Sequence, residues 1–292
     1  MSKQLLDNFI ERCRNLKVAV LGETIIDEFI SVVYEGQSMK SFCPVFRDTR
    51  EKVIRQEGGT LAIYNHIKNF VKQADFFSNP KDAIIKTRFI DANNGQKHIE
   101  WNRFDKSYFS ELEVDCNKYD AVILADFGHG LSDYIKINDG FYLMCQTNSN
   151  NFGFNRLSKW KNFRKKAVCL DLREASLQIN RRLDSCSDND AIEIYNYELN
   201  TQSLYITLGA KGSLFTDGYN VYRHGSFKTQ IVDTIGAGDA YFAFAVLSDV
   251  LQLPINERLL IASLAASLST TWLCNEKSVT PENLINHANR YL

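Results

Sequence analysis

Short apolar runs recur along the chain, and most of them are followed by a polar or helical stretch. The runs are apolar throughout rather than alternating, and they fall at residues 17–22, 121–126, 142–145, 167–171, 191–194 and 204–209. Strands of this kind are typical of a parallel sheet that is covered on both faces. The pattern therefore predicts a layered α/β fold, in which ligands bind beyond the carboxyl ends of the strands.

Two segments depart from this pattern. Residues 28–55 and 83–108 alternate apolar with polar side chains and are rich in β-branched and aromatic residues. Within the second segment, Asn93-Asn94-Gly95 is a hairpin signal. We expect these segments to form a small accessory sheet inserted into the main domain. Periodicity further predicts helices over 2–16, 236–253 and 255–273, and strands within 203–229.

The composition of the chain excludes several classes of protein. Hydrophobic residues make up 45% of the 292 residues, which is too many for a disordered chain. The 34 Lys and Arg balance the 35 Asp and Glu, so we expect no nucleic-acid partner. No stretch approaches the ~18–20 apolar residues of a membrane span, and residues 1–14 lack a signal-peptide core. The seven cysteines contain no CxxC pair, which indicates reduced thiols in a cytoplasmic protein.

The strongest chemical signal lies at residues 232–244, where a glycine-containing turn leads directly into an apolar helix. Free N–H groups at a helix N-terminus form an anion site, and Gly236 and Gly238 let the backbone approach a phosphate closely. Asp239 lies at the same helix start, where a carboxylate could accept a proton from an attacking hydroxyl. From spacing alone, Asp239 could equally be a helix cap.

The segment Asp233-Thr-Ile-Gly-Ala-Gly-Asp239 resembles the C-terminal signature of the ribokinase-like (PfkB) carbohydrate kinases. No Gly-Lys-Ser/Thr of a Walker A loop is present. The resemblance implies one domain over 1–292, a three-layer α/β/α sandwich with a mostly parallel central sheet and a β-sheet lid formed by about 28–55 and 83–108. It also implies that Asp239 is the catalytic base and that the backbone of Gly236, Ala237 and Gly238 forms an anion hole.

The start of the chain resembles sugar kinases similar to the heptose-phosphate kinase domain of ADP-heptose synthases. In those kinases an Asp at the place of Asp27 binds sugar hydroxyls, and paired glycines such as Gly58 and Gly59 precede a long helix. Ala62 stands where the family often places Asn, which is a departure at the expected sugar site. A surface turn or cap is the alternative for Asp27.

Basic residues on the lid strands are a second part of that resemblance. Lys86, Arg88 and Arg103 fall where the heptose-phosphate-like kinases carry cations, and strand alternation would place Lys86 and Arg88 on one face. Cations there would favour a phosphorylated sugar. Solvated lid charges are the alternative interpretation.

Three further segments match the family with departures. In 125–130, which resembles an Asp-Tyr-Gly-Lys-Gly loop, Asp126 would contact acceptor, water or magnesium, with a structural turn as the alternative, and His129 replaces the usual Lys. Asp171 (in place of Asn) and Glu174 would organise Mg²⁺ and its waters, with a helix cap as the alternative for Asp171. The nucleotide-binding residues implied by the resemblance are Thr207, Gly209, Gly212 and Asp233.

An ATP-dependent sugar kinase that uses Mg²⁺ and acts on a heptose-phosphate type of sugar is the leading prediction. A monovalent cation such as K⁺ beside the anion hole and a homodimer through the lid also follow from the resemblance, although no residue decides the cation. The alternatives are a kinase of a nucleoside, a fructose-type sugar or another small alcohol, and a catalytically weak binding subunit that partners a nucleotidyltransferase. Residues 146–148 and 151–155 resemble kinase-like domains found with surface-polysaccharide enzymes.

Overall fold

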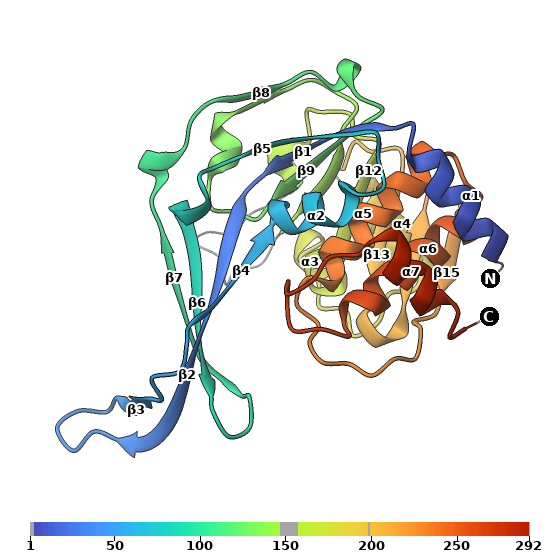
Figure 1. Cartoon of the computed structure of the whole chain (residues 1–292). Coiled ribbons are helices and arrows are strands. Elements are labelled where there is room, and N and C mark those ends of the chain that lie inside the picture. Colours follow the sequence, from blue (N-terminus) through green and yellow to red (C-terminus); the bar gives the residue numbers. More distant parts are fainter. Residues whose placement is uncertain (1–2, 147–156, 198, 292) are drawn as a thin grey trace.

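A central sheet of eight strands forms the middle layer of the protein (Figure 1). The computed structural model describes residues 3–146, 157–197 and 199–291, so most of the segment compared above with surface-polysaccharide enzymes lies outside the described residues. The strands of this sheet are β1 (Lys17–Gly22), β5 (Gln73–Ser78), β9 (Ala121–Asp126), β11 (Tyr142–Cys145), β12 (Ala167–Asp171), β13 (Leu204–Thr207), β14 (Ser213–Thr216) and β15 (Val221–His224). Their order is β15-β14-β13-β12-β11-β9-β1-β5, parallel from β5 to β13 and antiparallel from β13 to β15.

Helices cover both faces of this sheet. The described helices are α1 (Lys3–Cys13), α2 (Thr60–Ile67), α3 (Leu172–Gln178), α4 (Asp188–Asn196), α5 (Ala237–Val250), α6 (Ile255–Ser269) and α7 (Pro281–Ala288). In β1, Val18 and Val20 pack in the core shared with α1, α2, α5, α6 and α7, whereas Ala19 and Leu21 pack in the core shared with α3 and α4. Because successive residues of a strand face opposite sides, the apolar run of β1 supplies both cores. The predicted three-layer α/β/α sandwich is confirmed.

A second sheet projects from one end of the layered body (Figure 1). It contains β2 (Thr24–Gln37), β3 (Pro44–Asp48), β4 (Ile54–Gly59), β6 (Ile84–Asp91) and β7 (Lys97–Phe104), in the order β3-β2-β6-β7 with β4 paired to β2. The β6–β7 hairpin turns at the predicted Asn93-Asn94-Gly95, where Gly95 has a φ of 73°. Only Glu23 separates β1 from β2, so the second sheet begins directly at the carboxyl end of a central strand.

One predicted strand is wrong. Residues 191–194 belong to helix α4, which begins at a capping box formed by Ser187 and Asp190. Ala191 and Ile194 lie three positions apart and are buried together on one face of this helix. A four-residue apolar run fits a buried strand and a helix face equally well. The helix predicted to reach residue 273 ends at Ser269.

The remaining elements are short. Strands β8 (Leu112–Val114) and β10 (Ile135–Ile137) form a parallel pair. Single 3₁₀ turns lie at η1 (Lys81–Ala83), η2 (Lys106–Tyr108), η3 (Cys116–Lys118), η4 (Leu131–Tyr134), η5 (Leu157–Trp160) and η6 (Gly209–Lys211). In the part of the chain that the structure describes, none of the helices combines the length and the hydrophobicity that crossing a bilayer requires.

Candidate active site

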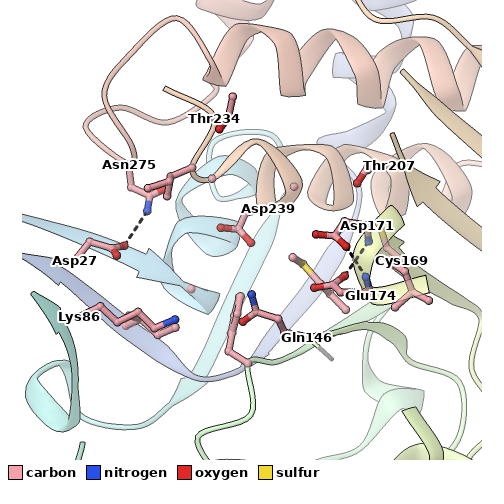
Figure 2. Close-up of a pocket in the computed structure, with 18 of the residues that line it drawn as sticks. Asp27, Lys86, Gln146, Cys169, Asp171, Glu174, Thr207, Thr234, Asp239 and Asn275 are labelled. Carbon is pink, nitrogen blue, oxygen red and sulfur yellow. Dashed lines mark hydrogen bonds between the residues drawn. The ribbon is translucent and has the colours of Figure 1, made fainter. Parts of the chain in front are cut away.

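A cavity of about 320 Å³ lies where the carboxyl ends of the central strands meet the second sheet. Its walls come from the ends of β11, β12 and β13, from β2 and β6 of the second sheet, and from the start of α5. This is the edge at which parallel α/β sheets bind ligands. The cavity brings together Asp239, Asp27, Lys86 and Glu174, whose side chains converge on one space in Figure 2.

The N-terminus of α5 opens onto this cavity. Gly236 is the N-cap residue and has a φ of 84°, a left-handed conformation that favours glycine. A Cβ atom at this position would lie 2.6 Å from Asn275 Oδ1. Among the described residues no side chain caps the helix; the Ala237 amide donates to the Thr234 carbonyl at 3.3 Å, so the amides of Gly238 and Asp239 are the first that remain available to a ligand. Gly236 and Gly238 both line the cavity, and Ala237 is the first helical residue between them.

Asp239 is the third residue of α5, and its side chain points into the cavity rather than capping the helix (Figure 2). The side chain is 8% exposed. Burial and, to a smaller extent, the nearby Asp27 carboxylate raise the pKa of Asp239 from 3.8 to about 7, against the opposing effect of Lys86. A carboxylate with a pKa near neutrality is suited to accept a proton at physiological pH.

Asp27 and two cations of the second sheet form the wall opposite α5. Asp27 on β2 is the register partner of Lys86 on β6, and Arg88 forms an ion pair with Asp27 through its Nη1 atom. Lys86 and Arg88 are each only 9% exposed, so they are not solvated lid charges. Gly59 lines the same wall, and a Cβ on Gly58 would collide with Asp27 Oδ2. Asp27 lies within β2 and is 5% exposed, which excludes a surface turn.

Arg103 is not brought to the cavity. It pairs with Ile85 across the hairpin, and alternation therefore places it on the opposite face from Lys86 and Arg88. There Arg103 Nη2 contacts Glu28 Oε2 at 2.9 Å and Thr87 Oγ1 at 3.2 Å. The structure thus separates the three cations that the sequence resemblance grouped.

The structure of the loop after β9 also differs from the prediction. Asp126 is 2% exposed and does not line the cavity; its carboxylate accepts hydrogen bonds from Trp160 Nε1 at 2.9 Å and from the Gly128 amide at 3.1 Å. Burial raises the pKa of Asp126, and the neighbouring Glu23 carboxylate adds to the increase. His129 is buried against Glu23 instead of facing a phosphate. Phe127 is the residue of this loop that lines the cavity.

The cavity contains only some of the residues predicted to bind nucleotide. Thr207 lines the cavity at the end of β13, whereas Gly209, Gly212 and Asp233 do not. Gly212 has a φ of 92° and packs against the His224 carbonyl, so it serves the η6–β14 turn. Asp233 Oδ1 accepts the amides of Thr234 at 2.7 Å and Ile235 at 3.1 Å, which shapes the loop before the N-terminus of α5.

Asp171 and Glu174 form a capping box at the start of α3. The Glu174 amide donates to Asp171 Oδ1 at 2.6 Å, and the Asp171 amide donates to Glu174 Oε2 at 2.8 Å. Both residues nevertheless line the cavity, and burial together with the Asp171 charge raises the pKa of Glu174 well above its usual range. Among the described residues no three His, Cys, Asp or Glu side chains gather as a metal site. Two carboxylates suffice for Mg²⁺, which keeps several waters, so the pair fits such an ion.

Sequence reasoning missed Gln146 and Asn275, which both line the cavity. Gln146 directly follows β11, and its position after a strand of the parallel sheet could have indicated it. Asn275 Nδ2 lies 3.5 Å from Asp27 Oδ2 (Figure 2). These residues are 248 positions apart in the chain, so no local pattern signals their contact.

Comparisons with known proteins agree with this arrangement. A model of the pfkB family carbohydrate kinases matches residues 144–273, which include the α5 segment. No curated protein sequence matches the chain.

Solved structures share the fold at low identity. Ribokinase from Arabidopsis thaliana, complexed with ribose and ATP, is 13% identical with a TM-score of 0.67 over 94% of this chain and 98% of that chain. The Methanocaldococcus jannaschii nucleoside kinase is 14% identical with a TM-score of 0.66, over 95% and 99%. Escherichia coli phosphofructokinase-2 in complex with fructose-6-phosphate is 13% identical with a TM-score of 0.58, over 95% and 100%. The family model thus matches less than half of the chain, and the solved structures, at 13–14% identity, show that the fold is ribokinase-like.

Proposed function

We propose that the protein transfers the γ-phosphoryl group of ATP to a hydroxyl of a phosphorylated sugar. One observation carries this proposal: Asp239 shares a buried cavity with the uncapped N-terminus of α5 on one side and with Asp27, Lys86 and Arg88 on the other. A base, an anion site and an acceptor wall are the parts that phosphoryl transfer needs. The ribokinase of similar fold that was solved with ribose and ATP fits the choice of donor.

In the proposed reaction, Asp239 removes the proton of the acceptor hydroxyl as its oxygen attacks the γ-phosphorus. The bond from that phosphorus to the bridging oxygen breaks, and ADP leaves. The N–H groups at Gly236–Gly238 stabilise the negative charge on the transferring group. Asp171 and Glu174 would hold Mg²⁺, which neutralises phosphate charge when bound. A divalent cation there would also favour the ionised form of Glu174, whose pKa is raised by burial and, to a smaller extent, by the Asp171 charge. The K⁺ site stays a prediction.

The charges of the second sheet favour a phosphorylated acceptor. Arg88 contacts both Asp27 and Glu100, the latter at 3.0 Å through Nε, while Lys86 reaches the same cavity from the same strand face. Burial lowers the pKa of Lys86. An acceptor phosphate would offset this desolvation, because an opposite charge stabilises the ammonium form. A heptose phosphate remains the favoured candidate by sequence resemblance, and phosphofructokinase-2 with fructose-6-phosphate is a fold relative with a sugar phosphate bound.

An ADP-release assay tests the proposal and its alternatives. The purified chain is offered ATP and Mg²⁺ with ribose, fructose, nucleosides, fructose 6-phosphate and heptose phosphates. We expect the highest kcat/KM with a phosphorylated sugar. Faster turnover of a neutral sugar or nucleoside would favour the second kinase interpretation. No turnover with any acceptor, combined with ligand binding by calorimetry, would favour a binding subunit that partners a nucleotidyltransferase. Cytoplasmic location and a place in surface-polysaccharide synthesis stay predictions from the sequence.

The second sheet also supports our proposal of a homodimer. Its outer strands and tip carry exposed apolar side chains, with Met39 100%, Phe42 98% and Trp101 55% exposed. Light scattering should give twice the chain mass of 33.4 kDa, and Phe42→Asp should reduce it to one chain. Tyr219→Asp is the matched control, because Tyr219 is 88% exposed on the β14–β15 hairpin. A monomeric wild-type chain would refute the dimer.

A further inference from the structure

A buried carboxylate stands directly behind the acceptor end of the cavity. Glu23 is the single residue between β1 and β2, and its side chain is 1% exposed. Four donors surround it: the amides of Phe127 at 2.9 Å, His129 at 2.9 Å and Leu131 at 3.1 Å, and the His129 ring atom Nδ1 at 3.0 Å. These hydrogen bonds to the carboxylate lower the pKa of Glu23 and outweigh the opposing effect of burial. Glu23 therefore remains ionised inside the protein.

The backbone of Glu23 holds a second wall of the cavity. The Thr60 amide donates to the Glu23 carbonyl at 2.9 Å, which fixes the turn that contains Gly59. The Glu23 amide in turn donates to the Ala125 carbonyl at 3.4 Å, at the end of β9. One residue thus joins the start of β2, the Gly59 turn and the loop over 126–131.

All three segments reach the acceptor end of the cavity. Phe127, Gly59 and Asp27 line it. The Phe127 amide donates to Glu23 Oε2, and the Thr60 amide, next to Gly59, donates to the Glu23 carbonyl. Asp27 lies on β2, the strand that follows Glu23. Glu23 itself does not line the cavity. Glu23 can therefore affect a bound substrate through the neighbouring residues whose backbone it holds in place.

We infer that Glu23, braced by His129, is a positioning residue that sets the acceptor wall of the active site. The carboxylate fixes Phe127 through the loop amides, and the backbone carbonyl of Glu23 fixes the turn that contains Gly59 by accepting the Thr60 amide. The His129 imidazole donates from Nδ1 to Glu23 Oε2 and so orients the carboxylate toward the three amides. This role explains why a histidine occupies the fourth position of a loop expected to carry a phosphate-binding lysine: the side chain points behind the loop, away from the cavity.

The design of the test follows from the four donors. In Glu23→Gln one carboxylate oxygen becomes an NH₂ group, which cannot accept the hydrogen bonds of the donors that face it. Oε1 accepts the amides of His129 and Leu131, and Oε2 accepts Phe127 and the imidazole. Either orientation of the Gln amide therefore leaves at least one backbone N–H of the loop without its acceptor, even if the imidazole changes tautomer and accepts from the NH₂ group. We expect the KM for the sugar acceptor to rise roughly 10- to 100-fold, because hydrogen bonds to charged groups are among the stronger ones. The KM for ATP should change by less than about twofold, because the nucleotide end is not attached to Glu23.

Hydrogen exchange gives a readout that does not depend on the reaction. The amides of residues 127, 129 and 131 should be strongly protected in the wild-type chain and should exchange faster in Glu23→Gln. Glu113→Gln is the matched control, because Glu113 is exposed on β8 and should leave both readouts unchanged. His129→Gln retains a donor and should show a smaller rise in acceptor KM than His129→Leu.

Several results would overturn the inference. An unchanged acceptor KM in folded Glu23→Gln is one, and an equal rise in the KM values of acceptor and ATP is another. If Glu23→Gln does not fold, hydrogen exchange of the wild-type chain tests the inference instead. Exchange of the amides of residues 127, 129 and 131 at the rates of an unstructured peptide would contradict the positioning role of Glu23. The kinetic arm rests on the proposed kinase function, whereas the exchange arm does not. A chain without kinase activity but with the expected exchange pattern would therefore fail the proposed function alone.

Discussion

The pH dependence of catalysis should report the environment of Asp239. Burial and the Asp27 carboxylate raise the pKa of Asp239 to about 7. The base must be ionised to accept a proton, so kcat/KM should rise with pH and level off above this value. For a group with this pKa, the ionised fraction grows from about 0.09 at pH 6 to about 0.91 at pH 8, so kcat/KM should rise roughly tenfold.

Two substitutions should move this titration in opposite directions. Asp27→Asn removes a negative charge that raises the pKa of Asp239, so the acidic limb should shift to lower pH. Lys86→Gln removes a positive charge that lowers this pKa, so the limb should shift to higher pH. Both variants will lower the rate itself, because both residues line the acceptor wall. The position of the limb, rather than its height, is therefore the quantity to compare.

The assay is ADP release at subsaturating acceptor, measured from pH 5.5 to pH 9 with thermal unfolding as a control for folding. A sugar phosphate titrates with a pKa near ~6 itself, but its contribution is common to all three proteins. A shift between variants must then come from the enzyme. Limbs that coincide in wild type, Asp27→Asn and Lys86→Gln would refute the assignment of the limb to Asp239.

Three other predictions concern the same cavity. Asp239→Asn should lower kcat by ~10²–10⁴-fold. The same variant should be more stable than wild type at pH 8 by up to about 4 kcal/mol, because the wild-type folded state must ionise a buried group whose pKa is raised from 3.8 to about 7. In urea unfolding, the difference in the free energy of unfolding should shrink below pH 7 and vanish near pH 4. Arg88→Ala should raise the acceptor KM much more than Arg103→Ala, its match on the opposite face, when initial rates are compared. Gly236→Ala should weaken ATP binding in calorimetry, since its Cβ would lie 2.6 Å from Asn275 Oδ1.

Much of the fold could be predicted because the apolar runs are long enough to settle the type of element. The run of β1 supplies both cores by alternation, which only a strand covered on two faces requires. The run at 191–194 does not support that inference, because Glu193 interrupts it and Ala191 and Ile194 satisfy a helix face equally well. The capping pair Ser187 and Asp190, one turn earlier, was the local signal that distinguished the two.

Strand register decides which face of the second sheet carries Lys86, Arg88 and Arg103. Alternation alone places Lys86 and Arg88 together, because they lie on one strand. Arg103 lies on the next strand, and its face is set by how the hairpin pairs. The pairing shifts between Phe89 and Ile90, and such an irregularity changes which side chains share a face. A hairpin signal in the sequence predicts that the two strands pair, but it does not determine which of their side chains face the same side of the sheet.

Polar residues at strand ends were the hardest to place, because they have two possible uses. Asp126 and Glu23 both follow or end a central strand, yet their carboxylates accept hydrogen bonds from amides, Trp160 and His129 within the protein. A loop that crosses the end of a sheet leaves backbone N–H groups that need acceptors when water is excluded. Asp27, by contrast, faces the cavity from within β2, whose backbone pairs with β4 and β6. A strand-end acid can therefore serve the backbone, a ligand or both, as Asp171 shows by accepting the Glu174 amide while lining the cavity, and which use applies depends on the folded loop.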